Sequence, residues 1–277
     1  MSSTEGIEKK AAIIYDFDGT LARGNLQECS FLPTMNMRRE EFWGRVKEMT
    51  KREDADEILV YMHLMLAKAK EAKIEVTKEM LREHGRSAPL FPGLEDCSWF
   101  TRINAFAEGH GLDLQHYIIS SGIEEMIGGC TIQPAFHRIY ASKYIYDGDV
   151  ASWPGVAINY TTKTQYLFRI NKGVENHWNN NAINAYMPKR TRLIPFERMI
   201  FLGDGDTDIP TMKMLTYQGG HSIAVYDEQR EKRDLEKIHR LISDDRADFV
   251  APANYEENSQ LDIIVKGILG RIAHLSV

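Results

Sequence analysis

The sequence carries an acidic motif whose spacing suits phosphoryl chemistry. DFDGT spans residues 16–20 directly after the apolar run AAIIY, so Asp16 and Asp18 lie two residues apart on one turn. One carboxylate could attack phosphorus as a nucleophile, while the other protonates the leaving alcohol and later activates water. Gly19 permits a tight backbone, and Thr20 offers a hydroxyl and an amide to a phosphate oxygen. Taken alone, the motif is equally compatible with a simple Asp-Gly turn after a strand.

A second acidic motif, GDGDTD, spans residues 203–208 and follows another apolar run. Asp204 and Asp208 lie four residues apart across a strand-to-helix turn, and carboxylates gathered there suit Mg²⁺, a hard cation that prefers oxygen ligands. A helix cap at Asp206, Thr207 or Asp208 would use the same residue types. An EF-hand calcium loop would need flanking helices and a later glutamate, and the sequence has neither.

Two weaker signals lie between these motifs. YIISSG puts Ser120 and Ser121 after an apolar run, where a hydroxyl could bind a phosphoryl oxygen, although Ser-Gly after a strand is more often only a loop. Lys163 lies near the start of a predicted helix, where its charge could offset that of a phosphoryl group and a nucleophile. A lone helical lysine is ordinarily solvated, and Lys172 is a competing candidate.

These residues need a scaffold that brings distant segments together. Short apolar runs predict strands that are buried on both faces. The predicted strands span 11–15, 114–119, 198–202, 222–225 and 248–251. Helical patterns lie between them, over 94–108, 161–172, 209 onward, 231–242 and 261–272. Asp147-Gly148 predicts a hairpin within 135–160, and 174–197 is predicted to be mostly irregular.

This alternation predicts an α/β fold, with a doubly wound, Rossmann-like core around a mainly parallel sheet. Sites in such sheets form at the carboxyl ends of the strands, and three of the predicted strands end in Asp or Ser. Residues 38–86 have helical patterns and follow the first acidic motif. We therefore predict an inserted α-helical cap domain over 26–88, and a core domain formed by 1–25 and 89–277.

Together these features resemble the four motifs of the haloacid dehalogenase superfamily. The order matches: DFDGTL at 16–21, a strand ending in Ser120, a lysine at 163 and GDGDTD at 203–208. The sequence is most similar to the phosphoserine-phosphatase-like branch, whose C1-type helical cap follows the first motif.

The resemblance implies a role for each matching residue. Asp16 resembles the nucleophile, which is transiently phosphorylated, and Asp18 resembles the general acid and base. Ser120 and Lys163 resemble the phosphate-binding pair, to which we add Ser121. The implied cofactor is Mg²⁺, held by the residues at the family's acidic positions: Asp16, Asp18 through its carbonyl, Asp204 and, in support, Asp208.

Asp18 narrows the reaction class, because relatives that cleave carbon–halogen bonds lack this aspartate and the ion-pumping ATPases carry threonine there. We expect a Mg-dependent phosphomonoester hydrolase that acts through an aspartyl-phosphate on a small phosphorylated metabolite. The alternatives are a phosphotransferase and a catalytically idle binding or regulatory module. A dinucleotide-binding oxidoreductase would need GxGxxG after the first strand, which the sequence lacks.

Three residues follow the first motif where relatives place substrate-reading side chains: Arg23, Gln27 and Glu28. They could contact a substrate head group, or they could tie the cap linker to the core.

Composition fits a soluble, cytoplasmic protein. The 277 residues are 43% hydrophobic and 27% charged, which allows a sizeable core. A net charge of −6 gives no general electrostatic reason to bind nucleic acid or an anionic membrane. Three cysteines without a CxxC pair favour a reducing compartment. The N-terminus lacks a secretory pattern, and no run approaches the roughly 20 apolar residues of a membrane helix.

Overall fold

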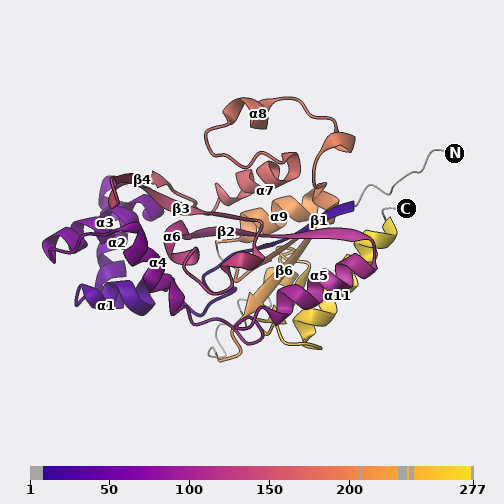
Figure 1. The fold of residues 1–277 in the computed structure, drawn as a ribbon, viewed down its shortest axis with the longest axis horizontal. Helices are drawn as coiled ribbons and strands as arrows, with labels where there is room; N and C mark the ends of the chain where they lie inside the picture. Colours follow the sequence, from indigo (N-terminus) through magenta and orange to yellow (C-terminus); the bar gives the residue numbers. More distant parts are fainter. Residues whose placement is uncertain (1–8, 206, 230–235, 237–239, 276–277) are drawn as a thin grey trace.

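The structure is a computed structural model of the chain, and it describes residues 9–205, 207–229, 236 and 240–275. In this part of the chain, seven strands form one sheet with the order β4-β3-β2-β1-β5-β6-β7 (Figure 1). The strands are β1 (Lys9–Tyr15), β2 (Leu112–Ile123), β3 (Arg138–Asp147), β4 (Val150–Val156), β5 (Met199–Gly203), β6 (His221–Tyr226) and β7 (Phe249–Pro252). Only the β3–β4 pair of these strands is antiparallel. The predicted doubly wound, Rossmann-like α/β fold with a mainly parallel sheet is confirmed.

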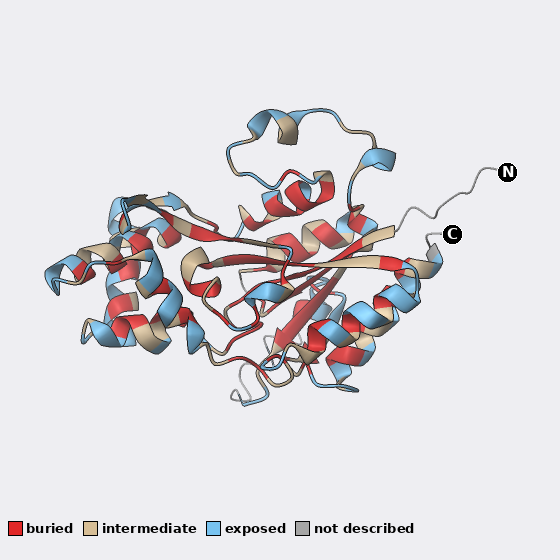
Figure 2. Ribbon diagram, in the orientation of Figure 1, coloured by how far each residue is buried: buried red, intermediate tan, exposed pale blue. Residues whose placement is uncertain are grey.

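Helices cover both faces of the sheet. On one face lie α5 (Ser98–Gly109) and α11 (Gln260–Leu275), and on the other lie α7 (Lys163–Lys172) and α9 (Ile209–Tyr217) (Figure 1). The central strand β1 sends Ile13 and Tyr15 into the first layer and Ala12 and Ile14 into the second. Figure 2 shows the central strands buried between the two layers, which explains their continuous apolar runs.

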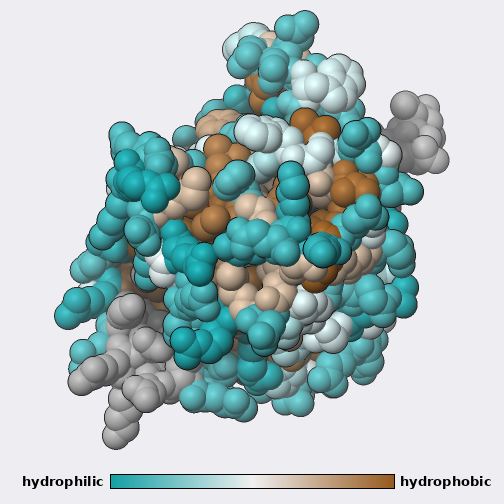
Figure 3. Space-filling view, turned by 90° about the vertical axis from the view of Figure 1, so that its left-hand side faces the viewer, coloured by the Kyte–Doolittle hydropathy of each residue, from teal (hydrophilic) through white to brown (hydrophobic). Residues whose placement is uncertain are grey.

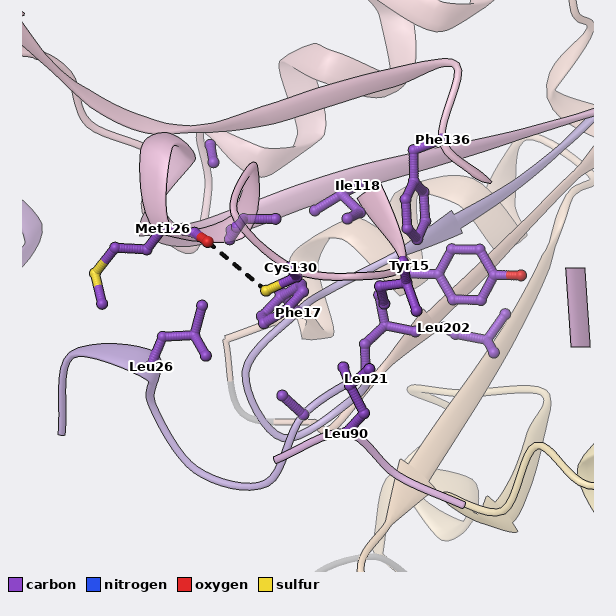
Figure 4. Close-up of a cluster of buried hydrophobic side chains, with 14 of the residues drawn as sticks. Tyr15, Phe17, Leu21, Leu26, Leu90, Ile118, Met126, Cys130, Phe136 and Leu202 are labelled. Carbon is purple, nitrogen blue, oxygen red and sulfur yellow. Dashed lines mark hydrogen bonds between the residues drawn. The ribbon is translucent and has the colours of Figure 1, made fainter. Parts of the chain in front are cut away.

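A core residue anchors the first acidic motif. Phe17, between the two aspartates, is fully buried in the cluster that also contains Tyr15, Leu21 and Leu202 (Figure 4). Its carbonyl accepts backbone hydrogen bonds from the amides of Leu21 and Ala22 at 2.9 and 3.1 Å. The turn that carries the carboxylates is therefore fixed both by packing and by hydrogen bonds.

The segment that follows this turn is helical. It contains the π-helical turn η1 (Gln27–Phe31), α1 (Leu32–Thr34), α2 (Arg39–Glu53), α3 (Glu57–Glu71) and α4 (Lys78–Arg86). We call residues 27–86 the helical layer; it forms one end of the molecule, and its outer face is mostly hydrophilic (Figures 1 and 3). The predicted helical character of 38–86 is confirmed, whereas η1 and α1 were not predicted.

The β3–β4 hairpin, predicted at Asp147-Gly148, reaches the helical layer. The hydroxyl of Tyr144 donates to the carbonyl of Met62 at 3.0 Å, and the amide of Ala151 donates to the carbonyl of Val76 at 2.8 Å. An extension of the core sheet therefore supports the layer from one side.

The prediction for the second strand was too short. β2 runs on through Ser120 and Ser121 to Ile123, where the sequence had indicated a strand over 114–119 followed by a loop. The register with β3 shifts between Ser120 and Ile123, as at a β-bulge. The apolar pattern stops at the bulge, so these polar residues gave no strand signal.

Of the other predicted segments, one is confirmed and two lie largely outside the described residues. The segment 174–197 is mostly irregular, as predicted, apart from α8 (Asn180–Asn184) and short 3₁₀ turns. The helix predicted over 231–242 lies largely outside the described residues, as does nearly all of the polar lead-in over 1–9. None of the helices that the structure describes combines the length and the apolar character needed to span a bilayer.

Candidate active site

The candidate catalytic residues meet at the carboxyl ends of three adjacent strands. Asp16 follows β1, Ser120 lies near the end of β2, and Asp204 follows β5. β1 lies between the other two strands, and its last residue, Tyr15, is level with Ile118 of β2 and Leu202 of β5. Doubly wound sheets bind their ligands at this edge.

Lys163, at the start of α7, joins two of the aspartates. Its Nζ lies 2.9 Å from Oδ2 of Asp16 and 2.6 Å from Oδ1 of Asp208. The side chain is fully buried, which opposes its charge, but the two carboxylates outweigh burial and raise the pKa of Lys163 above its ordinary value. Lys172 instead donates to two carbonyls of the 174–197 segment. This geometry favours Lys163 as the phosphate-binding lysine.

Two glycines make room for the acidic side chains. A Cβ on Gly19, whose φ is +77°, would lie 2.3 Å from Oδ2 of Asp204. A Cβ on Gly203 would lie equally close, 2.3 Å, to Oδ2 of Asp208. Both positions therefore exclude a side chain for steric reasons: Asp204 packs against the turn of the first motif, and Asp208 packs against the end of β5.

The three aspartates form a donor set that fits a magnesium ion. One oxygen each from Asp16, Asp204 and Asp208 lies within 4.8 Å of the others. Oδ2 of Asp208 is buried and accepts no hydrogen bond from the part of the chain that the structure describes, so it has lone pairs to spare. Carboxylate oxygens are the ligands that Mg²⁺ prefers.

Replacing Gly203 should disturb this arrangement. We expect Gly203→Ala to lower the free energy of unfolding by roughly 1–3 kcal/mol, because the added methyl must displace the Asp208 carboxylate. Gly267→Ala on α11 is the matched control, since in the described part of the chain a Cβ there would meet nothing within 4 Å apart from its own helix backbone and chain neighbours. That change should be neutral or stabilise by up to about 1 kcal/mol. Chemical denaturation measures both, and equal stabilities would contradict this account of Gly203.

Asp18 lies in an environment that favours its protonated form. It is half-buried, and its Oδ1 accepts a hydrogen bond from the amide of Leu26 at 3.2 Å. Burial, and then the negative charge of Asp16, raise the pKa of Asp18 to about 8. A carboxyl that keeps its proton near neutral pH can protonate a leaving group.

The same shift makes the stability of the metal-free protein depend on pH. Asp18 has an ordinary pKa of 3.8, raised to about 8 by folding, so the folded state binds more protons than the unfolded state between these values. The free energy of unfolding should therefore fall as the pH rises through this window. Asp18→Asn removes this contribution and should raise the Tm at pH 7.5 by at least about 2 °C, with little change at pH 4.

Thermal unfolding of metal-free protein at both pH values measures this effect. Asp113→Asn serves as control, because that carboxylate pairs with Lys10 and no gain is expected. If the wild type and Asp18→Asn showed the same pH dependence, the raised pKa of Asp18 would be wrong.

A cavity of about 640 Å³ lies between these residues and the helical layer. The strand ends contribute Asp16, Asp18, Ser120, Ser121, Gly122 and Asp204 to its wall. The helices α2 and α3 contribute Arg39, Glu40, Trp43, Gly44, Lys47, Glu57, Ile58 and Tyr61. These helical residues were not predicted from the sequence, although the spacing of Arg39, Trp43 and Lys47 at i, i+4 and i+8 indicates a common face.

The three proposed substrate-contacting residues separate in the structure. Gln27 and Glu28 line the cavity. Gln27 is buried, and its Oε1 finds no hydrogen-bond partner within the described residues, whereas Glu28 accepts from three side chains: Asn25, Trp43 and Arg39. Arg23 lies outside the cavity wall. Its Nε donates to Asp227 at 3.2 Å and its guanidinium lies 4.8 Å from the centre of the Phe91 ring, so it ties the linker to the core.

The proposed phosphate-binding residues also differ in whether they line the cavity. Thr20 is fully buried and is not part of the cavity wall; its amide donates to the carbonyl of Phe17 at 3.2 Å. Ser120 and Ser121 do line the cavity. Oγ of Ser120 accepts from the amide of Gly122 at 3.0 Å, which leaves its own hydrogen available to a phosphoryl oxygen.

Known proteins resemble this chain in sequence and in fold. The family model described as haloacid dehalogenase-like hydrolase matches residues 13–213. An uncharacterized protein from Borreliella burgdorferi is 26% identical over 280 residues, which cover 92% of this chain and 94% of that protein.

Two solved structures share the fold. A substrate-bound phosphoserine phosphatase superposes with a TM-score of 0.55 at 17% identity, covering 94% of this chain and 98% of its own. A probable phosphoserine phosphatase from Vibrio cholerae has a TM-score of 0.57 at 14% identity, covering 98% of this chain and 68% of its own.

Proposed function

Because the chain belongs to the haloacid dehalogenase-like hydrolases, we propose that it is a magnesium-dependent phosphomonoester hydrolase that forms an aspartyl-phosphate. One observation carries the proposal. The Asp16 carboxylate lies 2.9 Å from a buried lysine and shares the cavity with Asp18, whose pKa is raised. A nucleophile and an acid are thereby available to the same substrate.

These positions support a two-step reaction. A carboxylate oxygen of Asp16 attacks phosphorus, and the bond to the ester oxygen breaks as Asp18 gives that oxygen its proton. Asp18, now a carboxylate, then takes a proton from water, whose oxygen attacks the aspartyl-phosphate and releases inorganic phosphate. The charge of Lys163 and the hydroxyl of Ser120 offset the charge on the phosphoryl oxygens throughout.

The metal has a supporting role in this proposal. Asp16, Asp204 and the carbonyl of Asp18 would hold Mg²⁺, with Asp208 in support; when bound, the ion neutralises negative charge on the phosphoryl group.

We also propose that residues 26–88 act as a cap domain on a core formed by 1–25 and 89–277. The two connecting segments are hydrogen-bonded to each other: the amide of Arg23 donates to the carbonyl of Pro89 at 2.9 Å. The cap contacts the core beside the chemistry, because the hydroxyl of Tyr61 donates to the carbonyl of Ser121 at 2.6 Å. A cap held in this way can exclude water during transfer and then open.

Hydrogen exchange tests the movement of the cap. Beryllium fluoride, a phosphate mimic, should increase protection around Gly24, around 89–93 and on the face of α3 that meets Asp16, because closure orders both connections. Asp16→Asn, which cannot hold the mimic, should show no change. Unchanged exchange in wild-type protein with the mimic demonstrably bound would indicate a rigid lobe.

A screen of phosphorylated metabolites tests the activity itself. With Mg²⁺ present, we expect phosphate release from at least one small phosphorylated metabolite in the screen. Adding competing alcohols separates a hydrolase from a phosphotransferase, because only the latter moves the phosphoryl group to them. Binding of metabolites without any release or transfer would favour the idle binding module.

A further inference from the structure

A second cavity, of about 410 Å³, lies at the opposite edge of the sheet from the candidate active site. Its wall includes Arg198, just before β5, and His221, at the start of β6. Asp204 follows β5 at the other end, and a five-residue strand spans roughly 17 Å. No described residue lines both cavities. The second cavity is therefore a separate feature, and we call it the basic cavity.

Positive charge dominates its wall. Five cationic side chains face a single carboxylate, that of Glu197; the five are Lys189, Arg190, Arg192, Arg198 and Arg271. The chain as a whole carries a net charge of −6, so this concentration runs against its overall balance. Within the described part of the chain, none of the five forms an ion pair with a carboxylate.

Two of these cations are held partly out of water. Arg192 and Arg198 are half-buried, and among the described residues Nε of Arg192 reaches only the carbonyl of Met187, at 3.5 Å, which is long for a hydrogen bond. Removing guanidinium groups from water costs free energy unless an anion offsets it, and neighbouring cations add to the cost. An anion in the cavity would offset both the cost of desolvation and the repulsion between the cations.

Asn171 adds a neutral acceptor to the same wall. It is fully buried near the end of α7; its Nδ2 donates to the carbonyl of Ile194 at 2.7 Å, but its Oδ1 has no hydrogen-bond partner among the described residues. A buried oxygen without a donor suits a ligand that brings a hydroxyl or amine as well as negative charge.

We propose that the basic cavity binds a small molecule that carries two or more phosphoryl groups. Arginine forks match the geometry of phosphate oxygens, and several forks exceed what one phosphate needs. The cavity volume falls within the range of small-ligand sites. The acidic balance of the whole chain disfavours an extended polyanion such as nucleic acid. This site stands apart from the proposed catalysis and needs neither metal nor turnover.

Calorimetric titration with inorganic pyrophosphate tests the proposal. Protein freed of metal on a chelating resin should bind one pyrophosphate, with orthophosphate at least about tenfold weaker because it offers fewer charges. Without metal, the acidic catalytic cavity repels either anion. Arg192→Gln combined with Arg198→Gln should weaken pyrophosphate binding at least tenfold.

Two further variants keep the outcome decisive. The pair Arg39→Gln and Lys47→Gln removes two cations from the catalytic cavity and should leave pyrophosphate binding unchanged. If the Arg192/Arg198 variant fails to fold, Lys189→Gln with Arg190→Gln replaces it, because both side chains are exposed. Absence of saturable binding, or loss of binding only in the Arg39/Lys47 variant, would overturn the proposal. Tighter, arginine-dependent binding of single-stranded DNA than of pyrophosphate would overturn the small-molecule assignment.

Discussion

Asp16→Asn should reduce the rate of phosphate release at least about 10⁴-fold, because an amide oxygen is a far weaker nucleophile than a carboxylate. The substitution keeps the size of the side chain and an oxygen that can accept from the amide of Phe17, as Asp16 Oδ1 does at 2.7 Å. Lys163 also keeps its partner Asp208. The variant should therefore fold, and the loss should lie in the chemical step.

Steady-state release of phosphate from the best substrate of the screen measures the effect. Asp113→Asn is the control, a partly exposed carboxylate that pairs with Lys10 and does not line the cavity. Acid-quenched wild-type enzyme should carry a phosphoryl group on the peptide that contains Asp16, and Asp18→Asn should be slow and accumulate it. Wild-type rates in Asp16→Asn would rule out this residue as the nucleophile.

The fold was largely predictable because parallel strands buried on both faces have a simple signature. The runs before Asp16 and Asp204 are apolar without alternation, and polar residues mark where they end. The same logic failed at β2, where the strand continues past Ile119 through Ser120, Ser121 and Gly122 to Ile123, with a bulge in its pairing to β3. A pattern of hydrophobicity cannot show a strand that continues through serine and glycine.

Some features of the candidate site could be predicted from the sequence, and others could not. Sequence order alone indicated the strand ends, since parallel connections bring them to one edge. The burial of the Lys163 side chain could not be predicted, because its pairing with Asp208 depends on how α7 packs against the sheet. For Arg23 the sequence left open a substrate contact or a link between cap and core, and the structure shows the residue bonded to Asp227, from a distant loop.

The α2 residues that line the cavity could not be predicted from the sequence, for a physical reason. The face of α2 that lines it mixes Arg39, Trp43 and Lys47, so it resembles a solvated surface rather than a core stripe. That face borders a cavity because the fold places α2 over the strand ends.

Removal of divalent metal should abolish phosphate release, and Mg²⁺ should restore it. The oxygens of Asp16, Asp204 and Asp208 lie within 4.8 Å of one another, so an approaching phosphate meets concentrated negative charge. Two like charges about 4 Å apart repel by about 4 kcal/mol at an effective dielectric constant near 20, which corresponds to roughly 10³-fold in rate. Ca²⁺ should bind but support little activity, because its coordination shell is larger and looser.

Asp204→Asn should weaken Mg²⁺ binding at least about tenfold in a calorimetric titration, because it removes one negative ligand from the set. Asp245→Asn is the control: this exposed residue has a φ of +56° that asparagine tolerates, and its ion pair in the described structure is with Lys213 at the surface. Full activity in excess chelator, after metal removal has been verified by elemental analysis, would exclude the metal from the mechanism. Equal Mg²⁺ affinity in both variants would instead remove Asp204 from the ligand set and leave the metal to other groups. The chelation experiment therefore tests whether the reaction needs a metal, and the titration tests whether Asp204 is one of its ligands. The three converging carboxylates predict a positive result in both experiments.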